Sequence, residues 1–279
     1  SLKGISTRSS QVAVEAPFLD LFVIGGGAPE PVLASYRRLT GFPPELPLWS
    51  YGMWMSRMTY FSASEIEEIA ARLRAERFPC DVLHIDTGWF DKDWVCEWRF
   101  SDERFPDPAG FMRRLRERGF RVSLWQNPNI GGENRLLPHA VERGFVPTPD
   151  RGADRSASGS DFSLTEINGQ IDFSNTEAVA WYQGLLRDLF RMGASAIKTD
   201  FGEEIRMDVE YHGMSAHELR NLYGLLYQRA AFEETARATG EPVIWARAGW
   251  AGCQRYPVHW GGDAAASWDG LAGSLRGDR

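Results

Sequence analysis

Cysteine is scarce in this 279-residue chain, and its three cysteines, Cys80, Cys96 and Cys253, are widely separated. They are too few for a disulfide framework, and no CxxC or Cys/His ligand spacing occurs. We therefore expect neither a metal site nor redox chemistry, and no cofactor is indicated.

Long apolar runs and clusters of basic residues are also missing. No segment approaches the roughly 20 apolar residues that cross a bilayer, so a membrane partner is not expected. The 31 basic residues are outnumbered by 38 acidic ones, which gives a net charge of −7. Because no Lys/Arg block could follow a phosphate backbone, nucleic acid is not an expected partner either. The sequence leaves open the compartment and any homo-oligomerisation of the full-length protein.

Apolar and aromatic residues, in contrast, are plentiful. Hydrophobic residues make up 43% of the chain, which is enough to bury a full-sized core. The 11 Trp and 8 Tyr are generous for this length, and flat rings of this kind cover the apolar faces of sugars in binding clefts. A single Trp is more often a core residue, so composition alone only makes carbohydrate a candidate ligand.

The N-terminal part of the chain differs from the remainder. Residues 11–24 are predicted to form one or two short strands, closed by three successive glycines. A short helix and a Pro-rich connection follow, and such connections mark domain boundaries. We therefore predict the end of an N-terminal β-sandwich domain at 1–27, a linker with a short helix at 28–48, and a catalytic domain at 49–279.

From residue 49 onward, strand patterns alternate with helix patterns. Each predicted helix begins at a capping residue, followed by a proline or, three positions later, by an acidic residue. These starts are Ser62 with Glu65, Asp107 with Pro108, Ser174 with Glu177, and Ser215 with Glu218. The predicted strands cover residues 51–56, 81–86, 121–127, 195–200, 242–247 and 257–262. Repeated strand and helix units of this kind predict a parallel α/β sheet.

The alternation of side chains along these strands favours a barrel over an open sheet. One side of the strands is polar toward the carboxyl end, whereas the other side is apolar. An open sheet would bury both sides under helices, but in a TIM-type (β/α)8 barrel the polar side faces the interior and the active-site mouth. About six βα units fit into the chain, so we predict an incomplete barrel. The positions on the polar side are His84, Asp86, Ser123, Trp125, Asn127, Lys198, Asp200, Trp245, Arg247, His259, Gly261 and Asp263.

Two of these positions carry the chemistry that the sequence indicates best. Asp200 ends the run AIKTD and Asp263 ends VHWGGD, so both carboxylates lie where a strand runs into a turn. Paired carboxylates are the minimum equipment for cleaving a glycosidic bond. Lys198 precedes Asp200 by two residues and would favour its ionised form. Trp260, together with the charge of Asp200, would help Asp263 to hold a proton.

Seven motifs occur in a fixed order along the chain. They read WSYGMWMS, HIDTGWF, FPDPAGFMRRLRERGFRVSLWQNPNI, IDFSN, AIKTDFGE, WARAG and YPVHWGGD. This series resembles glycoside hydrolase family 31, nearest its α-xylosidase-like branch, over nearly all of residues 22–279. The resemblance implies that Asp200 is the nucleophile and Asp263 the acid/base. The substrate-binding candidates, of which the resemblance implies the first four, are Asp86, Trp125, Lys198, Arg247 and Trp260.

The resemblance implies a retaining, exo-acting α-glycoside hydrolase that releases a nonreducing-end sugar, xylose or glucose, from an α-linked oligosaccharide or glycoside. The reaction would be a double displacement through a covalent glycosyl-enzyme, for which the two carboxyl groups stand about 5 to 5.5 Å apart. An α-galactosidase or transglycosylase of the same family stays open, as does a catalytically silent carbohydrate-binding fragment. A Schiff-base reaction at Lys198 is disfavoured, because a lysine beside two aspartates stays protonated.

Two departures from the family pattern bear on this expectation. The α-xylosidase-like members carry bulky residues after the aspartate of the HxD motif, whereas this chain has Thr87 and Gly88. We therefore expect room for a hexose hydroxymethyl group. Because part of the barrel and the C-terminal β domains of the family do not fit into the chain, we also expect a fragment, truncated at both ends, that is inactive or poorly soluble alone. The polar segment at about 128–170 is expected to be an insertion that shapes the acceptor side.

Overall fold

The computed structural model describes residues 2–6, 9–12, 17–147 and 169–277, and the chain divides into two compact units, Ser1–Phe42 and Pro43–Arg279. In the first unit, the elements are β1 (Leu2–Ser6), which pairs antiparallel with β2 (Ser9–Val12), and α1 (Pro29–Thr40).

The strand prediction for residues 11–24 is largely wrong. Strand structure ends at Val12, residues 17–24 form no strand, and residues 13–16 lie outside the described part. A strand needs a neighbour to pair with, and the described part of this unit offers none to residues 17–24. The assignment of 1–27 to an N-terminal β-sandwich domain stays a prediction.

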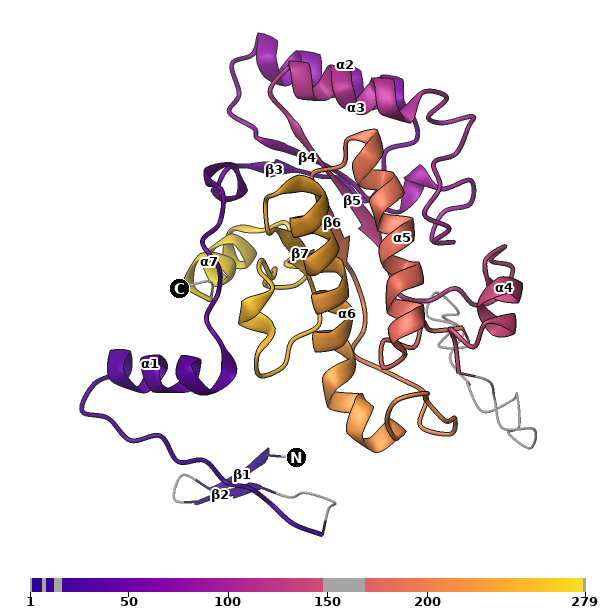
Figure 1. Ribbon diagram of the computed structural model, residues 1–279. Coiled ribbons are helices and arrows are strands. Elements are labelled where there is room, and N and C mark those ends of the chain that lie inside the picture. The colour runs from indigo at the N-terminus through magenta and orange to yellow at the C-terminus, as the bar shows by residue number, and fades with distance from the viewer. Residues whose placement is uncertain (1, 7–8, 13–16, 148–168, 278–279) are drawn as a thin grey trace. The chain divides into compact units, whose positions relative to one another are not determined.

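The second unit is built on a parallel sheet of five strands whose spatial order follows the chain (Figure 1). The strands are β3 (Trp54–Met55), β4 (Val82–Ile85), β5 (Arg121–Gln126), β6 (Ala196–Thr199) and β7 (Ile244–Ala246). The helices between them are α2 (Ala63–Ala75), α3 (Pro108–Glu117), α5 (Thr176–Met192) and α6 (Ala216–Thr239). Adjacent parallel strands joined in sequence by helices are the arrangement of a (β/α) barrel, so the predicted incomplete barrel is confirmed.

The sixth predicted strand, 257–262, is much shorter than expected. It contacts β7 through one parallel bridge, between Ala246 and His259, and through a few further backbone hydrogen bonds. The segment thus takes the place of a sixth strand without forming a full ladder. It is followed by α7 (Trp268–Gly277).

Three of the four predicted helix starts are confirmed. The side chains that cap them are Ser62 for α2, Asp107 for α3 and Ser215 for α6. Ser215 forms a complete capping box with Glu218, in which each side chain bonds to the backbone N–H of the other residue. These caps satisfy N–H groups that have no partner inside the helix.

The predicted cap of α5 is wrong by one residue. Asn175 caps this helix by accepting from the Glu177 N–H at 2.9 Å. The Ser174 hydroxyl instead donates to Asp172 Oδ1 at 2.6 Å. Serine and asparagine are both good capping residues. Which of the two caps α5 therefore depends on Asp172, which binds the Ser174 hydroxyl and is not part of the Ser174–Glu177 pattern.

The outer side of the sheet is apolar, as predicted, and α5 and α6 lie side by side over it (Figure 1). Here Gln126 donates to the Tyr227 hydroxyl at 2.7 Å and accepts from the Tyr182 hydroxyl at 3.1 Å. Burial raises the pKa of both tyrosines, so they stay protonated. The Tyr227 hydroxyl also lies 3.4 Å from the backbone carbonyl of Asp200, which links α6 to the end of β6. The buried apolar positions of this side include Leu83, Ile85, Val122, Leu124, Ile197 and Ile244.

The predicted insertion at 128–170 lies partly outside the described residues, which omit 148–168. Its described part contains α4 (Leu137–Glu142), and an antiparallel bridge joins Asn129 to Gln170 at its base. Short 3-10 helices occur in other connections, namely η1 (Leu48–Tyr51), η2 (Thr87–Trp89) and η4 (Cys253–Arg255). No helix in the described ranges is both long and apolar enough to cross a bilayer.

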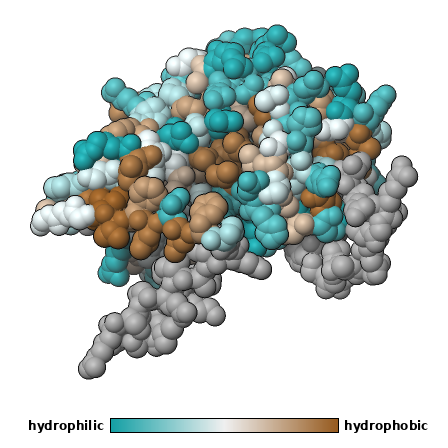
Figure 2. Space-filling view, turned by 60° about the horizontal axis from the view of Figure 1, so that its bottom comes forward, coloured by the Kyte–Doolittle hydropathy of each residue, from teal (hydrophilic) through white to brown (hydrophobic). Residues whose placement is uncertain are grey.

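Apolar side chains remain exposed where the sheet ends. Figure 2 shows hydrophobic side chains gathered over one face of the molecule. Among the exposed residues are Trp268, Leu271 and Leu275, which lie along one side of α7. A barrel helix normally lays this side on its own sheet layer. The exposed apolar side of α7 therefore agrees with the segment before it, which does not form a full strand ladder with β7.

Candidate active site

The carboxyl ends of β4, β6 and β7 bring four charged side chains together. Lys198 Nζ lies 3.1 Å from Asp86 Oδ2 and 3.7 Å from Asp200 Oδ2. On the other side, Arg247 Nη1 lies 3.2 Å from Asp200 Oδ1. Strand alternation predicts all four residues on one side of the sheet, and the structure places them in one cluster. This end of the strands is where barrels carry their active sites.

Asp200 is held at the centre of this cluster by donors to both of its oxygens. Trp125 Nε1 donates to Oδ2 at 2.6 Å, and the Phe201 N–H donates to Oδ1 at 3.0 Å. Both the Trp125 ring and the Asp200 side chain are buried. Charge-assisted hydrogen bonds of this kind fix the orientation of a carboxylate. Trp125 was expected to contact the sugar. In the structure it donates to Asp200, the predicted nucleophile.

Asp86 is oriented by His84, a residue that was predicted on the polar side but not as a site residue. His84 Nε2 lies 2.9 Å from Asp86 Oδ2, and Nδ1 lies 3.0 Å from Ser123 Oγ. Complete burial lowers the pKa of His84 despite the adjacent carboxylate, so the ring is neutral. We therefore assign the proton to Nε2, which donates to Asp86, while Nδ1 accepts from Ser123.

The charge on Asp86 follows from the same contacts. Burial alone raises the pKa of Asp86, but the hydrogen bond from His84 and the charge of Lys198 outweigh it and hold this pKa below its usual value. Asp86 is therefore an anion. The HxD spacing was the available signal for His84, because residues two apart share one side of a strand.

The buried His84 predicts a loss of stability in mild acid. Its pKa in the folded protein lies below the usual 6.5, so the unfolded chain binds the proton first as pH falls. Folding stability is then lost below about pH 6.5 as pH drops toward the folded pKa. We expect the urea midpoint, followed by tryptophan fluorescence, to fall less between pH 7.5 and 5.5 in His84→Gln than in the wild type. The exposed His217→Gln is the control, and an equal fall in all three proteins would contradict the assignment.

Trp260 lies at the site as predicted, but the side-chain alternation expected for its segment is wrong. Lys198 Nζ lies 4.7 Å from the centroid of the Trp260 ring and 5.1 Å from that of Trp245. His259, predicted to face the interior, instead contacts Gln228 of α6 through Nε2 at 3.2 Å. A shift of one residue moves every side chain of a strand to the opposite face. The segment is joined to β7 by one bridge and a few further backbone hydrogen bonds, and not by a full ladder.

Asp263 is exposed, and it is near enough to Arg247 for its charge to act on that side chain. Among the causes that raise the pKa of Arg247, the hydrogen bond to Glu203 is the largest, and the charge of Asp263 is a minor one. In the described residues the Asp263 carboxylate forms no hydrogen bond or ion pair. The role of Asp263 as a proton donor, and the dry surroundings expected for it, stay a prediction. The separation of the two predicted catalytic carboxylates stays a prediction.

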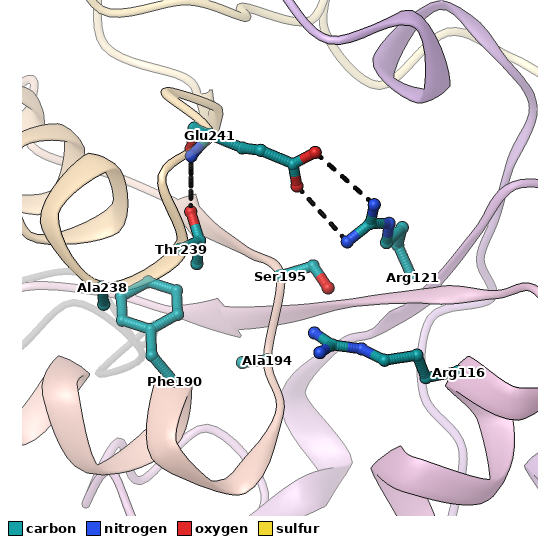
Figure 3. A pocket seen from close by; sticks show the side chains of 8 residues that line it. All are labelled: Arg116, Arg121, Phe190, Ala194, Ser195, Ala238, Thr239 and Glu241. Carbon is teal, nitrogen blue, oxygen red and sulfur yellow. Dashed lines mark hydrogen bonds and ion pairs between the residues drawn. The ribbon is translucent and has the colours of Figure 1, made fainter.

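Two cavities lie at opposite ends of the strands. A cavity of about 370 Å³ beside the cluster is lined by residues that include Asn129, Phe201 and Arg247. At the other end, a cavity of about 320 Å³ contains a pair formed by Arg121 and Glu241, which face each other in Figure 3 with Nη1 and Oε2 3.3 Å apart. That end of a barrel serves stability rather than chemistry. The cavity beside the charged cluster is therefore the one at the end of the strands where barrels carry their active sites.

Gly88 packs closely against the loop that precedes it. A Cβ atom at this position would lie 1.9 Å from Thr59 Oγ1 and 2.7 Å from the Tyr60 carbonyl oxygen. The space that a side chain would occupy at this position is therefore filled by the preceding loop, and the expected room for a hexose hydroxymethyl group stays a prediction. Glycine is required here by packing, so Gly88 gives no information about the sugar.

A half-barrel with charged side chains at the carboxyl ends of its strands belongs to the class of (β/α)-barrel enzymes. The family model described as the glycosyl hydrolases family 31 TIM-barrel domain matches residues 43–278. This chain belongs to glycoside hydrolase family 31, and the predicted family is confirmed.

Individual relatives agree with this assignment. The chain is 34% identical over 282 residues to an α-xylosidase of Emericella nidulans, covering 99% of this chain and 36% of that protein. It is 28% identical to human neutral α-glucosidase AB, covering 94% of this chain and 29% of that protein. A solved structure of a cycloalternan-degrading enzyme from Trueperella pyogenes superposes with a TM-score of 0.77 at 29% identity, covering 89% of this chain and 39% of that one. The chain thus spans about a third of the length of these relatives.

Proposed function

We propose that this chain carries the nucleophile side of a retaining, exo-acting α-glycoside hydrolase. The observation that supports this most directly is the setting of Asp200. Its two oxygens accept from Trp125 and from a backbone N–H, and the cations Lys198 and Arg247 lie within 4 Å. A buried carboxylate held in one orientation at a barrel mouth suits nucleophilic attack on an anomeric carbon.

The proposed reaction has two displacements. Asp200 attacks the anomeric carbon while Asp263 protonates the departing oxygen, which gives a covalent glycosyl-enzyme. Asp263, now a base, then removes a proton from water, and the water displaces Asp200. Each displacement inverts the anomeric centre, so the released sugar keeps the α configuration. To hold a proton for this step, the Asp263 side chain would have to be shielded from water, and in the described residues it is exposed.

The proposed substrate is an α-linked glycoside with xylose or glucose at its nonreducing end. Asp86 and Lys198 are placed to bind ring hydroxyls, and Trp260 offers a flat apolar face next to Lys198. Arg247 would contact the same sugar beside Asp200. Both sugars are proposed because the relatives include an α-xylosidase and an α-glucosidase.

A panel of aryl α-glycosides tests this proposal in the intact gene product that contains these 279 residues. We expect hydrolysis of the α-xyloside, the α-glucoside or both, and NMR of the first product should show the α anomer. The matched β-xyloside and β-glucoside are the controls and should not react. Preferred hydrolysis of the α-galactoside would overturn the sugar assignment, and a β anomer as first product would overturn the mechanism.

A further inference from the structure

Glu203, three residues after the predicted nucleophile, forms a two-point ion pair with Arg247. Arg247 Nε lies 2.6 Å from Glu203 Oε1, and Nη2 lies 2.8 Å from Oε2. This geometry uses one edge of the planar guanidinium group. The remaining Nη1 lies 3.2 Å from Asp200 Oδ1.

The geometry points to Glu203 as a positioning residue of the active site, which acts by holding Arg247 in a single orientation against Asp200. This inference rests on the proposed function. In the described residues Glu203 forms its ion pair with Arg247 and none of its hydrogen bonds reaches Asp200, so it acts on Asp200 through Arg247.

The turn after β6 is shaped to support this contact. Phe201 has a φ of +60° and Gly202 a φ of +94°, so the chain reverses sharply after Asp200. The reversal places the Phe201 ring 3.9 Å below the Arg247 guanidinium carbon and brings Glu203 to the guanidinium edge. Three residues of one turn thus contact Arg247: Phe201 through its ring face, Glu203 through its carboxylate, and Asp200, the proposed nucleophile.

Charge explains why the orientation of Arg247 matters. Without Glu203, the freed guanidinium edge could turn and bind both oxygens of Asp200, because a two-point contact to a carboxylate is the preferred geometry of arginine. A carboxylate held in this way is a weaker nucleophile. Glu203 therefore keeps one lone pair of Asp200 available and keeps Arg247 at the sugar.

The contribution of Glu203 to stability is expected to be small. Its side chain is 42% exposed and that of Arg247 33%, and ion pairs with this exposure add little to folding. An effect of its replacement on activity is therefore separable from an effect on folding.

The test compares Glu203→Gln, Glu203→Asp and the control Glu210→Gln in the intact gene product. Glu210 is exposed in the same connection and has no ion pair in the described part of the chain. We expect Glu203→Gln to lower kcat/KM by roughly 10- to 100-fold, mainly through kcat, since a small displacement of a catalytic contact has this scale of effect. The acid limb of the pH profile should move to lower pH, because unpaired positive charge is added to the site. Glu203→Asp should lie between, and Glu210→Gln should match the wild type.

A crystal structure of Glu203→Gln provides a readout that does not depend on activity. We expect the Arg247 guanidinium to turn from its present place toward Asp200. An unmoved Arg247, or a Glu203→Gln protein with wild-type kcat and pH profile, would overturn the inference. Failure of the proposed function is recognised separately, because the wild-type protein would then cleave none of the α-glycosides.

Discussion

Replacing Asp200 with alanine is expected to abolish glycoside cleavage, with kcat/KM reduced on the order of 10⁴-fold or more, as for loss of other covalent nucleophiles. The reason is that neither displacement can occur without a carboxylate at this position. No other described carboxylate can substitute, because Asp86 is engaged by His84 and Lys198 and Glu203 is engaged by Arg247. Initial rates on an aryl α-glycoside in the intact gene product provide the measurement.

Asp200→Asn is the matched variant for separating chemistry from folding. The amide oxygen of asparagine can still accept from Trp125, so the cluster keeps its shape, but the side chain is a poor nucleophile. We expect it to be as inactive as the alanine variant and to unfold at nearly the wild-type temperature.

Azide identifies the role of Asp200 further. In Asp200→Ala a small anion can enter the space of the missing carboxylate and attack from the same face, which gives a β-glycosyl azide after a single inversion. Activity of Asp200→Asn within tenfold of the wild type, or an α-glycosyl azide from Asp200→Ala, would remove Asp200 from the nucleophile role.

The cluster around Asp200 could be predicted from sequence because it depends on strand alternation. Asp86, Trp125, Lys198 and Arg247 each lie on or next to a strand with a full parallel neighbour, so their side-chain directions follow from position alone. The same argument failed at His259, in a segment that is joined to β7 by one bridge and a few further backbone hydrogen bonds and not by a full ladder. Alternation is reliable only where pairing fixes the register.

The contacts of Glu203 and the packing of Gly88 could not be predicted in this way. Glu203 reaches Arg247 only because Phe201 adopts a positive φ, a conformation that costs a non-glycine residue about 1–2 kcal/mol and that no local propensity indicates. Gly88 is required by contacts with Thr59 and Tyr60, residues of a different loop. Both features depend on which loops meet, and that is a property of the folded unit.

The framework of the fold could be predicted from local sequence patterns more completely than the site could. The apolar outer side of the strands, the helix caps and the strand order follow from local patterns and were predicted with small errors. The acid/base side of the site depends on what surrounds Asp263, which is exposed at the end of the sheet. The proposed nucleophile is therefore defined by its contacts within the chain, and the proposed acid/base by how its replacement affects different leaving groups.

Asp263→Ala is expected to slow cleavage in proportion to how much the leaving group needs a proton. For a sugar or alkyl leaving group we expect a loss of roughly 10²- to 10⁴-fold, the usual contribution of a general acid. For an α-glycosyl fluoride, whose leaving group needs no proton, the first displacement should be almost unaffected and the glycosyl-enzyme should accumulate, because no base activates water. Azide should then restore turnover and give an α-glycosyl azide, the opposite anomer to that from Asp200→Ala. Asp269→Ala, a change at an exposed aspartate of α7, is the control and should behave as the wild type. An equal loss on the fluoride and on the disaccharide would assign the acid/base to another residue, because only loss of the proton donor makes the effect depend on the leaving group.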